Sequence, residues 1–534
     1  MNSRLAAPRP DIIAISLVMH LLALALPMSL LQIYDRILPA QATGTAVVLV
    51  AGVAAAIVLE AFLRYGRTAL FAHAGARFEA DATARALDRL AVADIAVVEQ
   101  RGAAAVSDAL RAIGQIRDFW SGQAGVALYE APFVLVYLGL IAYIGGWLAW
   151  IPAMLFAAAA LVALFFNPSI ERAATAAEHA DARRRDLMWT TFAGIDDVKA
   201  MGAENAVAQA YRRLNADYMA ASAQLETRMA WIRENAGFFG QLATILVVAF
   251  GALAVMDGRL TTGALAACSI LAGRSIGPAM GSLGYWSQLA RIREAERRVA
   301  GLFDLPPVKA LDTRTVVDGA ASGPAVERGA LRIDAPGLLP APVDIAPGEV
   351  VLVDGPDDAD ISRLLTCVAG LASNPAVRVT VDGRAQAEYA HRDYRAAVCL
   401  ASRQPALVPG SILANLTLFD PRYNDAALEL GVRLGLQPYL DRLRHGVLSE
   451  VGPGAAEHLD EGIYQRIALI RALVRQPRIL LLDHAAMGID LDGIKRLAAL
   501  LQSLAGHTTV LVATHKPALI EACTRRLTLA GGRA

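Results

Sequence analysis

Long apolar stretches alternate with polar, arginine-containing stretches over the first 303 residues. Six apolar runs approach the length of about 20 residues that a helix needs to cross a bilayer. They cover residues 12–33, 46–63, 124–144, 147–166, 236–256 and 262–283. The polar segments 64–123 and 168–235 keep a helix-like periodicity. The pattern therefore predicts six transmembrane helices that continue well beyond the bilayer.

The distribution of arginine predicts how these helices are oriented. Both long polar segments are rich in arginine, whereas the connections after the first, third and fifth runs are short. Positive charge favours the cytoplasmic side, so both termini and both long segments are expected there. The first run lacks a signal-peptide cleavage pattern, so we expect it to remain a membrane helix with no separate domain before it.

The pattern changes after Phe303. Prolines and small residues fill residues 304–325, which predicts a linker. From Val326 onward, short apolar strands alternate with helical segments. The predicted fold class is thus a membrane α-helical domain over 1–303, followed by a P-loop-like α/β domain over 326–534.

Composition supports a chain that is partly membrane and partly soluble. Hydrophobic residues make up 55% of the chain, the mean hydropathy is +0.42 and the formal net charge is zero. A zero net charge argues against a nucleic-acid-binding protein. Cys268, Cys367, Cys399 and Cys523 lack metal-ligand spacing. We expect free thiols in a reducing compartment.

A phosphate-loop position carries unusual residues. The segment GPDDADISR (355–363) follows an apolar strand, the usual setting of a loop that binds phosphates through glycine amides and a lysine. Gly355 keeps the first glycine position and Ser362 the Mg²⁺ position, but Ile361 replaces the lysine. Acids stand in and around the later glycine positions, at Asp357, Asp358 and Asp360.

These changes oppose triphosphate binding. Two like charges about 5 Å apart at an effective dielectric of about 20 repel by roughly 3 kcal/mol. The only lysines of the chain are Lys199, Lys309, Lys495 and Lys516. Two further interpretations of the acids remain open. They can cap a helix that begins near Ile361, or they can form a divalent-cation site.

A second strand, RILLLD (478–483), ends in a candidate Mg²⁺-orienting acid, Asp483. The next residue is His484, where an ATP-hydrolysing phosphate-loop protein would carry a glutamate that polarises the attacking water. We therefore expect no catalytic residue here. Asp490 is retained in the loop that normally faces a partner subunit.

The signature region that caps the γ-phosphate across a dimer is also altered. Within residues 458–477, Asp460 and Glu461 replace a serine and a glycine, and Gly462 remains. Two acids would repel a partner's phosphate. An ordinary helix with acids in its first turn is an equally good explanation.

The other positions expected to contact a nucleotide are retained only in part. His515 follows an apolar strand at the position of a switch histidine. Arg403 takes the place of a nucleotide-sensing glutamine, with Gln404 beside it. No aromatic residue for adenine stacking is present in 332–340. The candidates for residual nucleotide binding are Gly355, Ser362, Gln404, Asp483 and His515, with Ser362 and Asp483 as the candidate Mg²⁺ ligands.

The order of these motifs resembles half-transporters of the ATP-binding cassette exporter superfamily, and within it the type I secretion permease/ATPases. The segments that carry the resemblance are LQIYDRILP (31–39), Glu130-Ala-Pro132, GIDDVKAMGAE (194–204), LTTGALAACSILAGRSIGP (260–278), RIALIRAL (466–473) and RILLLD (478–483). The resemblance covers the chain from about Ile12, but the residues at the nucleotide-contacting positions differ from those of the family.

The resemblance implies a multi-pass protein of the bacterial inner membrane with a cytoplasmic nucleotide-binding domain. It implies a dimer of two exporter halves and, as further partners, a periplasmic adaptor and an outer-membrane channel. The exported substrate would be a protein or peptide. ATP and Mg²⁺ are expected to bind weakly, with no tightly bound cofactor.

Two ionisable residues fall near membrane depth, Glu130 and Arg274. Such residues usually face a cavity or another polar group. They are therefore candidates for a transport path, with an internal pair or a cytoplasmic position as the alternative.

Three functions remain open from the sequence. The first is an exporter subunit with little or no ATPase activity that pairs with a competent half. The second is a homodimeric membrane scaffold or receptor that binds a protein and no nucleotide. The third is an active homodimeric ATP-driven exporter.

Overall fold

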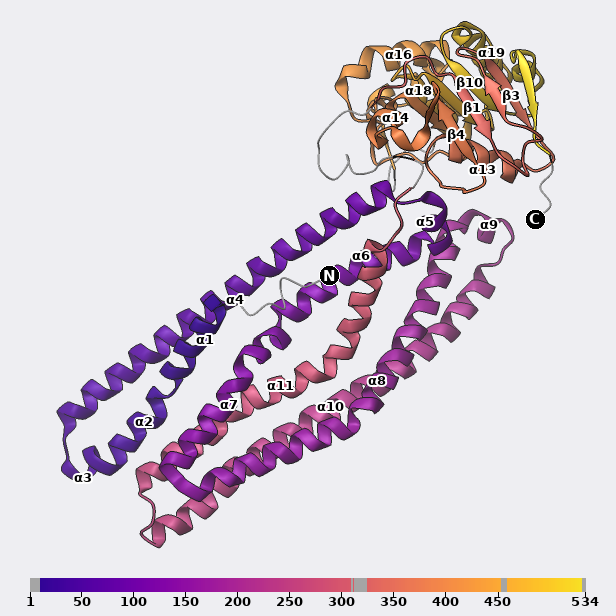
Figure 1. Cartoon of the computed structure of the whole chain (residues 1–534). Coiled ribbons are helices and arrows are strands. Elements are labelled where there is room, and N and C mark those ends of the chain that lie inside the picture. The colour runs from indigo at the N-terminus through magenta and orange to yellow at the C-terminus, as the bar shows by residue number, and fades with distance from the viewer. Residues whose placement is uncertain (1–9, 309–310, 312–323, 453–458, 531–534) are drawn as a thin grey trace. The chain divides into compact units, whose positions relative to one another are not determined.

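The computed structural model describes residues 10–308, 311, 324–452 and 459–530 (Figure 1). The chain forms two compact units. The helical unit comprises Met1–Leu87 and Gly102–Asp304, and the α/β unit comprises Asp88–Arg101 and Leu305–Ala534. The observed helical and α/β parts confirm the predicted fold class.

Long helices form the helical unit. Their bounds are α1 Pro10–Ala23, α2 Ala25–Gln32, α3 Leu38–Ala40, α4 Thr43–Val92, α6 Ala103–Ser121, α7 Gln123–Gly145, α8 Trp150–Ala193, α9 Ile195–Ala200, α10 Glu204–Met256 and α11 Thr262–Phe303. A π-helical turn at Ile33–Ile37 joins α2 to α3, and a 3₁₀ turn at Gly146–Ala149 joins α7 to α8.

Each predicted apolar run lies in this helical framework. By length and composition, four stretches can cross a membrane in the described residues: Pro10–Ala40, Thr43–Val92, Ala103–Ala193 and Glu204–Met256. The third contains both α7 and α8, and a shorter apolar helix covers Thr262–Ile276. At about 1.5 Å per residue, α8 and α10 are far longer than the roughly 30 Å hydrocarbon layer. They must therefore extend beyond the bilayer.

Close helix packing depends on small residues in this unit. Helix α10 lies against α8, and α11 lies against α7 and α10. A Cβ atom on Gly251 of α10 would fall 2.4 Å from Leu265 Cδ1 of α11. Glycine at this position thus allows α10 and α11 to approach closely.

Asp35 fixes the start of α11 from a distant part of the sequence. Its carboxylate accepts hydrogen bonds from Thr261 Oγ1 at 2.6 Å and from the Gly263 amide at 2.9 Å. Thr261 itself caps the helix by accepting a bond from the Ala264 amide at 3.1 Å. Two of the segments that carry the family resemblance are therefore joined through the Asp35 carboxylate.

The α/β unit is built on two larger sheets and a short one. A five-stranded parallel sheet has the order β11-β3-β10-β9-β6, and a four-stranded antiparallel sheet has the order β2-β1-β4-β5. The strands are β1 Leu331–Asp334, β2 Val343–Ile345, β3 Val350–Asp354, β4 Arg378–Val381, β5 Arg384–Ala385, β6 Val398–Ala401, β7 Gly410–Ser411, β8 Glu450–Val451, β9 Ile479–Asp483, β10 Thr509–Ala513 and β11 Arg525–Thr528.

Helices cover the parallel sheet on both faces, which explains its nearly uninterrupted apolar strands. The main helices are α13 Asp358–Val368, α14 His391–Ala397, α15 Ile412–Leu416, α16 Asn424–Arg433, α17 Gln437–Leu440, α18 Glu461–Leu473, α19 Leu491–Leu504 and α20 Pro517–Glu521. One core cluster packs α18 and α19 against the sheet. The other packs α13 and the four-stranded sheet against it.

The segment Asp88–Arg101 packs with the α/β unit, although the sequence analysis placed it in the membrane domain. It contains α5, Ile95–Arg101. Asp94 Oδ2 accepts a bond from the Ser373 amide at 2.8 Å, and the Ile95 amide donates to Leu371 O at 3.0 Å. Local helical periodicity contains no signal for such distant partners.

Most of the predicted linker, 304–325, lies outside the described residues.

An acid of the altered phosphate loop caps α13. Asp357 has extended backbone angles, and its Oδ1 accepts a hydrogen bond from the Ala359 amide at 2.8 Å. This is the geometry of an N-cap, in which a side-chain oxygen satisfies an amide that has no partner inside the helix. The capping interpretation is confirmed for Asp357, but α13 begins at Asp358 and not near Ile361 as expected, so Asp358 and Asp360 lie in its first turn.

His391 is a titratable group within the α/β unit. Its Nε2 atom is buried and has no hydrogen-bond partner among the described residues. Burial, reinforced by the nearby Arg395, lowers the pKa of His391 from the ordinary 6.5 to about 4. The folded unit therefore contains a neutral ring at neutral pH.

Asp357→Ala is expected to destabilise the α/β unit by about 0.5–2 kcal/mol because α13 loses its cap. Asp357→Asn should retain most of the stability, since asparagine supplies an equivalent oxygen. All six tryptophans lie in the helical unit, so urea unfolding of the full-length chain should be followed by pulse proteolysis of the C-terminal unit. Equal urea midpoints for wild type and Asp357→Ala would contradict the capping role.

The α/β unit is expected to lose stability as the pH falls from about 6.5 towards 4. In that window the unfolded chain binds a proton at His391 while the folded chain does not, so protonation favours unfolding. His391→Gln should reduce the difference between urea midpoints measured at about pH 7 and about pH 5. The exposed His445 provides the control, His445→Gln, which should keep the wild-type difference. An unchanged difference in His391→Gln would refute the assignment.

Candidate functional site

The candidate site lies at the carboxyl edge of the parallel sheet. Strands β3, β10, β9 and β6 are neighbours in that order and run parallel. Residues that follow them therefore meet at one edge, where α/β sheets bind ligands. Asp358 follows β3, His515 follows β10, His484 follows β9 and Arg403 follows β6. Segments spread over more than 150 residues thus meet in one cluster.

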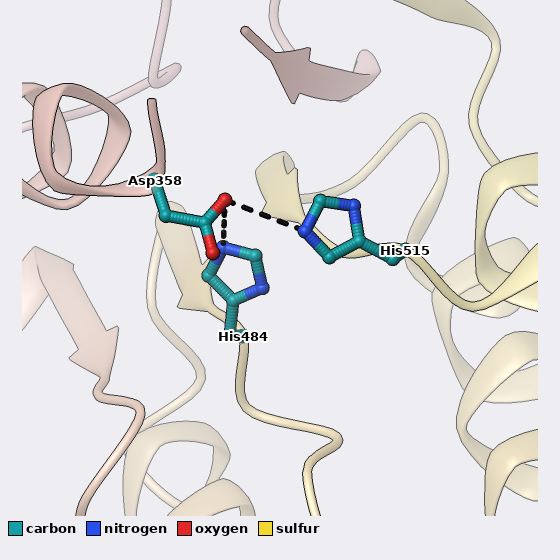
Figure 2. A group of neighbouring side chains, drawn as sticks. All are labelled: Asp358, His484 and His515. Carbon is teal, nitrogen blue, oxygen red and sulfur yellow. Dashed lines mark ion pairs between the residues drawn. The ribbon is translucent and has the colours of Figure 1, made fainter. Parts of the chain in front are cut away.

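The carboxylate of Asp358 is the centre of this cluster (Figure 2). One oxygen, Oδ2, accepts a hydrogen bond from Arg403 Nη2 at 2.9 Å. The other, Oδ1, lies 3.3 Å from His515 Nε2 and 3.5 Å from His484 Nε2. The two imidazole rings are tilted neighbours, with centroids 5.1 Å apart. A single carboxylate thus faces the switch-histidine position, the glutamate position and the sensing-glutamine position.

The surroundings set the charges in the cluster. Burial opposes ionisation of Asp358, but His484, Arg403 and His515 outweigh it, so the pKa of this carboxyl lies below its usual value. Burial lowers the pKa of His484 despite the neighbouring acids. At neutral pH the His484 ring is therefore neutral, and Arg403 is the permanent cation beside the Asp358 carboxylate.

The backbone at His484 is unusual. Its φ is +48°, in the left-handed region that few residues other than glycine adopt, and histidine is among those that tolerate it better. Its amide donates to Ala513 O at 3.0 Å, which joins the ends of β9 and β10. Only 6% of the His484 side chain is exposed. The backbone conformation of this turn therefore directs the His484 ring into the cluster.

The two candidate Mg²⁺ residues lie together beside the cluster. Ser362 Oγ donates a hydrogen bond to Asp483 Oδ1 at 2.9 Å. A hydroxyl and a carboxylate oxygen are ligands that Mg²⁺ accepts. This part of the site fits the metal that an ATP-binding cassette uses.

The residues of the phosphate loop make contacts within the α/β unit. The Ala359 amide is already bonded to Asp357, and the Asp358 carboxylate extends to the switch histidine. Asp360 pairs with Arg363 at 3.4 Å. Ile361, at the lysine position, is 1% exposed and belongs to the hydrophobic core. All three acids of this loop thus have partners among the described residues. Gly355, at the start of this loop, lies against Leu529.

The signature residues open α18. Asp460 occupies the N-cap position without a capping side-chain bond, and Glu461 lies in the first turn. Gly462 is required by packing, since a Cβ atom there would lie 2.6 Å from the carbonyl oxygen of Gly488. His458, the first residue of the predicted signature region, lies outside the described residues.

Asp490 and Gln404 both lie close to α18. Asp490 caps α19 by accepting from the Gly493 amide at 3.1 Å, and it also pairs with Arg466. Gln404 is exposed and lines a cleft of about 310 Å³ together with Tyr464. Its neighbour Arg403, not Gln404, reaches the phosphate loop.

The two candidate residues for a transport path, Glu130 and Arg274, each have an ionic partner. Glu130 of α7 accepts a hydrogen bond from Arg67 of α4 at 2.8 Å. Arg274 of α11 lies 3.8 Å from Glu60 of α4. Both pairs join helices across this unit, as ionisable groups at membrane depth usually do.

Sequence reasoning missed two contacts. Arg403 was identified only as a substitution, and its ion pair with Asp358 was not expected. The available signal was a pair of substitutions: the cation Arg403 stands at the position of a neutral glutamine, and the acid Asp358 stands at a glycine position 45 residues earlier. Asp35 lay in a segment that carried the resemblance, but no sequence pattern indicated that it caps α11.

Comparisons with known proteins agree with this architecture. Residues 12–278 match the family described as "ABC transporter transmembrane region", and residues 339–487 match the family described as "ABC transporter". The chain is 25% identical to the cyclolysin secretion/processing ATP-binding protein CyaB of Bordetella pertussis and 22% identical to the alpha-hemolysin translocation ATP-binding protein HlyB of Escherichia coli. Each match covers 98% of this chain and 74% of the relative.

A bacterial Atm1-family ABC exporter, solved with ATP bound, has a similar fold. The TM-score is 0.82 at 17% identity, and the match covers 98% of this chain and 93% of that one. Proteins with the matched cassette domain bind ATP and Mg²⁺, and that domain is cytoplasmic in multi-pass exporters. The chain therefore belongs to the ABC transporter family, with the transmembrane region and the ABC transporter domain in one polypeptide that has the exporter fold.

Proposed function

We propose that this chain is a subunit of a type I secretion-like exporter with little or no ATPase activity of its own. The observation that carries the proposal is the Asp358 carboxylate, which contacts Arg403, His484 and His515. In a working cassette the γ-phosphate occupies this region, and a like charge there opposes it by roughly 3 kcal/mol before screening.

The loss of catalytic groups supports the same proposal. His484 stands at the position of the water-polarising glutamate, and its ring is neutral at neutral pH because burial lowers its pKa. Ile361 packs in the core and supplies no ammonium to a phosphate. The Ser362–Asp483 pair would hold Mg²⁺ but cannot replace either function.

The proposed partner is a second exporter half with intact nucleotide motifs. Each site of an exporter dimer combines the phosphate loop of one half with the signature of the other. Asp460 and Glu461 in this chain would weaken the partner's site as well, so hydrolysis by the pair would be slow. The relatives are named for cyclolysin and alpha-hemolysin export. A protein or peptide substrate is proposed on that basis, together with a bacterial inner-membrane location, a periplasmic adaptor and an outer-membrane channel.

The purified chain alone is expected to show no vanadate-sensitive ATP hydrolysis, because it lacks both the lysine and the glutamate. A complex isolated from the native membrane should contain a second exporter half, identified by mass spectrometry, and should hydrolyse ATP slowly. Asp483→Asn in this chain provides the matched control. Hydrolysis by the isolated chain that disappears in Asp483→Asn would refute the proposal and favour an active homodimer.

Combining Asp358→Gly, Asp360→Gly and Ile361→Lys is expected to strengthen ATP binding by about tenfold or more, since two repulsive charges are removed and an ammonium is added. The lysine stem can pack where Ile361 lies while its ammonium extends towards the loop. Calorimetry on the full-length chain measures the change, and Asp358→Asn separates loss of charge from the added flexibility. Unchanged binding in the triple variant would show that other residues limit nucleotide affinity.

A further inference from the structure

The Asp358 cluster brings together three side-chain atoms of kinds that bind metal ions (Figure 2). Asp358 Oδ1, His484 Nε2 and His515 Nε2 all lie within 4.8 Å of one another. The other two acids of the loop are not involved, because Asp357 caps α13 and Asp360 pairs with Arg363. Of the three acids that suggested a cation site from the sequence, only Asp358 joins this group, and its partners are imidazoles.

We propose that Asp358, His484 and His515 form a binding site for one zinc-like divalent transition-metal ion. Three protein ligands and one open position is the arrangement found in many zinc sites. The inference goes beyond the proposed function, and a failure to bind metal would leave the expectation about ATP hydrolysis unchanged.

The donor spacing fits a tetrahedral ion. Zinc bonds to nitrogen and oxygen are about 2.0–2.2 Å long, so the donors of a tetrahedral site lie roughly 3.3–3.6 Å apart. Asp358 Oδ1 is 3.3 Å from His515 Nε2 and 3.5 Å from His484 Nε2. The remaining nitrogen–nitrogen gap closes by a rotation of His515, whose side chain is 66% exposed.

His484 is the second, independent indication of a ligand. Its side chain is 94% buried, its Nε2 points at the other two donors, and that atom has no hydrogen-bond partner among the described residues. A buried polar atom without a hydrogen bond normally has a free-energy cost. A metal–nitrogen bond would remove that cost without moving the ring.

The charges around the cluster also suit a cation. Asp358 and Asp483 are the nearby acids, and Arg403 is the nearby permanent cation. Arg403 bonds to Oδ2 of Asp358, which leaves Oδ1 turned towards the imidazoles. Carboxylates that bind metals are commonly oriented in this way by a second hydrogen bond. The excess of acid over base favours a dication over an anion.

The ligand types select the class of metal. Imidazole nitrogen is the preferred partner of Zn²⁺, Co²⁺, Ni²⁺ and Cu²⁺, whereas Mg²⁺ and Ca²⁺ prefer oxygen. A bound ion would connect the loops that follow β3, β9 and β10. It should therefore raise the stability of the α/β unit.

The test uses the full-length chain in detergent after chelator treatment. Titration with Zn²⁺ by calorimetry should give one ion per chain, and Co²⁺ should produce the visible absorption of a tetrahedral site without a thiolate band. His484→Ala, His515→Ala and Asp358→Asn should each abolish this binding. The exposed His507 supplies the matched control, and His507→Ala should bind as wild type does.

Folding of each variant is checked by its urea midpoint without metal, measured by pulse proteolysis. Because His515 is exposed and Asp358→Asn preserves shape, at least these two variants should stay folded. The proposal is overturned if wild type binds no Zn²⁺ or if His515→Ala binds as tightly as wild type. A thiolate band from Co²⁺ would overturn it too, because the ion would then be at a cysteine.

Discussion

The parallel order of β3, β10, β9 and β6 is the constraint on which the site depends. Parallel strands place all their carboxyl ends at one edge, so the residue after each strand is brought beside the others whatever its identity. A working cassette uses this convergence to surround a phosphate. Here the same edge holds an aspartate, an arginine and two histidines. The scaffold is unchanged, and only the groups that it brings together differ.

Most polar side chains at this edge have a partner among the described residues. Ile361, at the lysine position, packs with the core, and Asp357 caps α13. The Asp358 carboxylate occupies the space near the switch histidine and pairs with Arg403. Each of these side chains thus has a partner within the α/β unit.

Charged side chains of the helical unit also have partners. Glu130 and Arg274 each have an opposite charge on α4. Asp35 satisfies the free amide and hydroxyl groups at the start of α11. These ion pairs connect α4 to α7 and to α11.

The sequence alone determined the fold class, because apolar runs of membrane length and buried parallel strands have distinct periodicities. It also identified the positions of Ser362, Asp483 and His515 through their spacing after strands. Only the tertiary structure decided what Asp358 does, since its partners lie 45 to 157 residues away and spacing cannot specify a side-chain direction. The same holds for the segment 88–101, whose place in the α/β unit depends on hydrogen bonds to residues near 371–373. Periodicity indicates which face of an element is buried, whereas contacts between distant side chains arise only when folding brings their elements together.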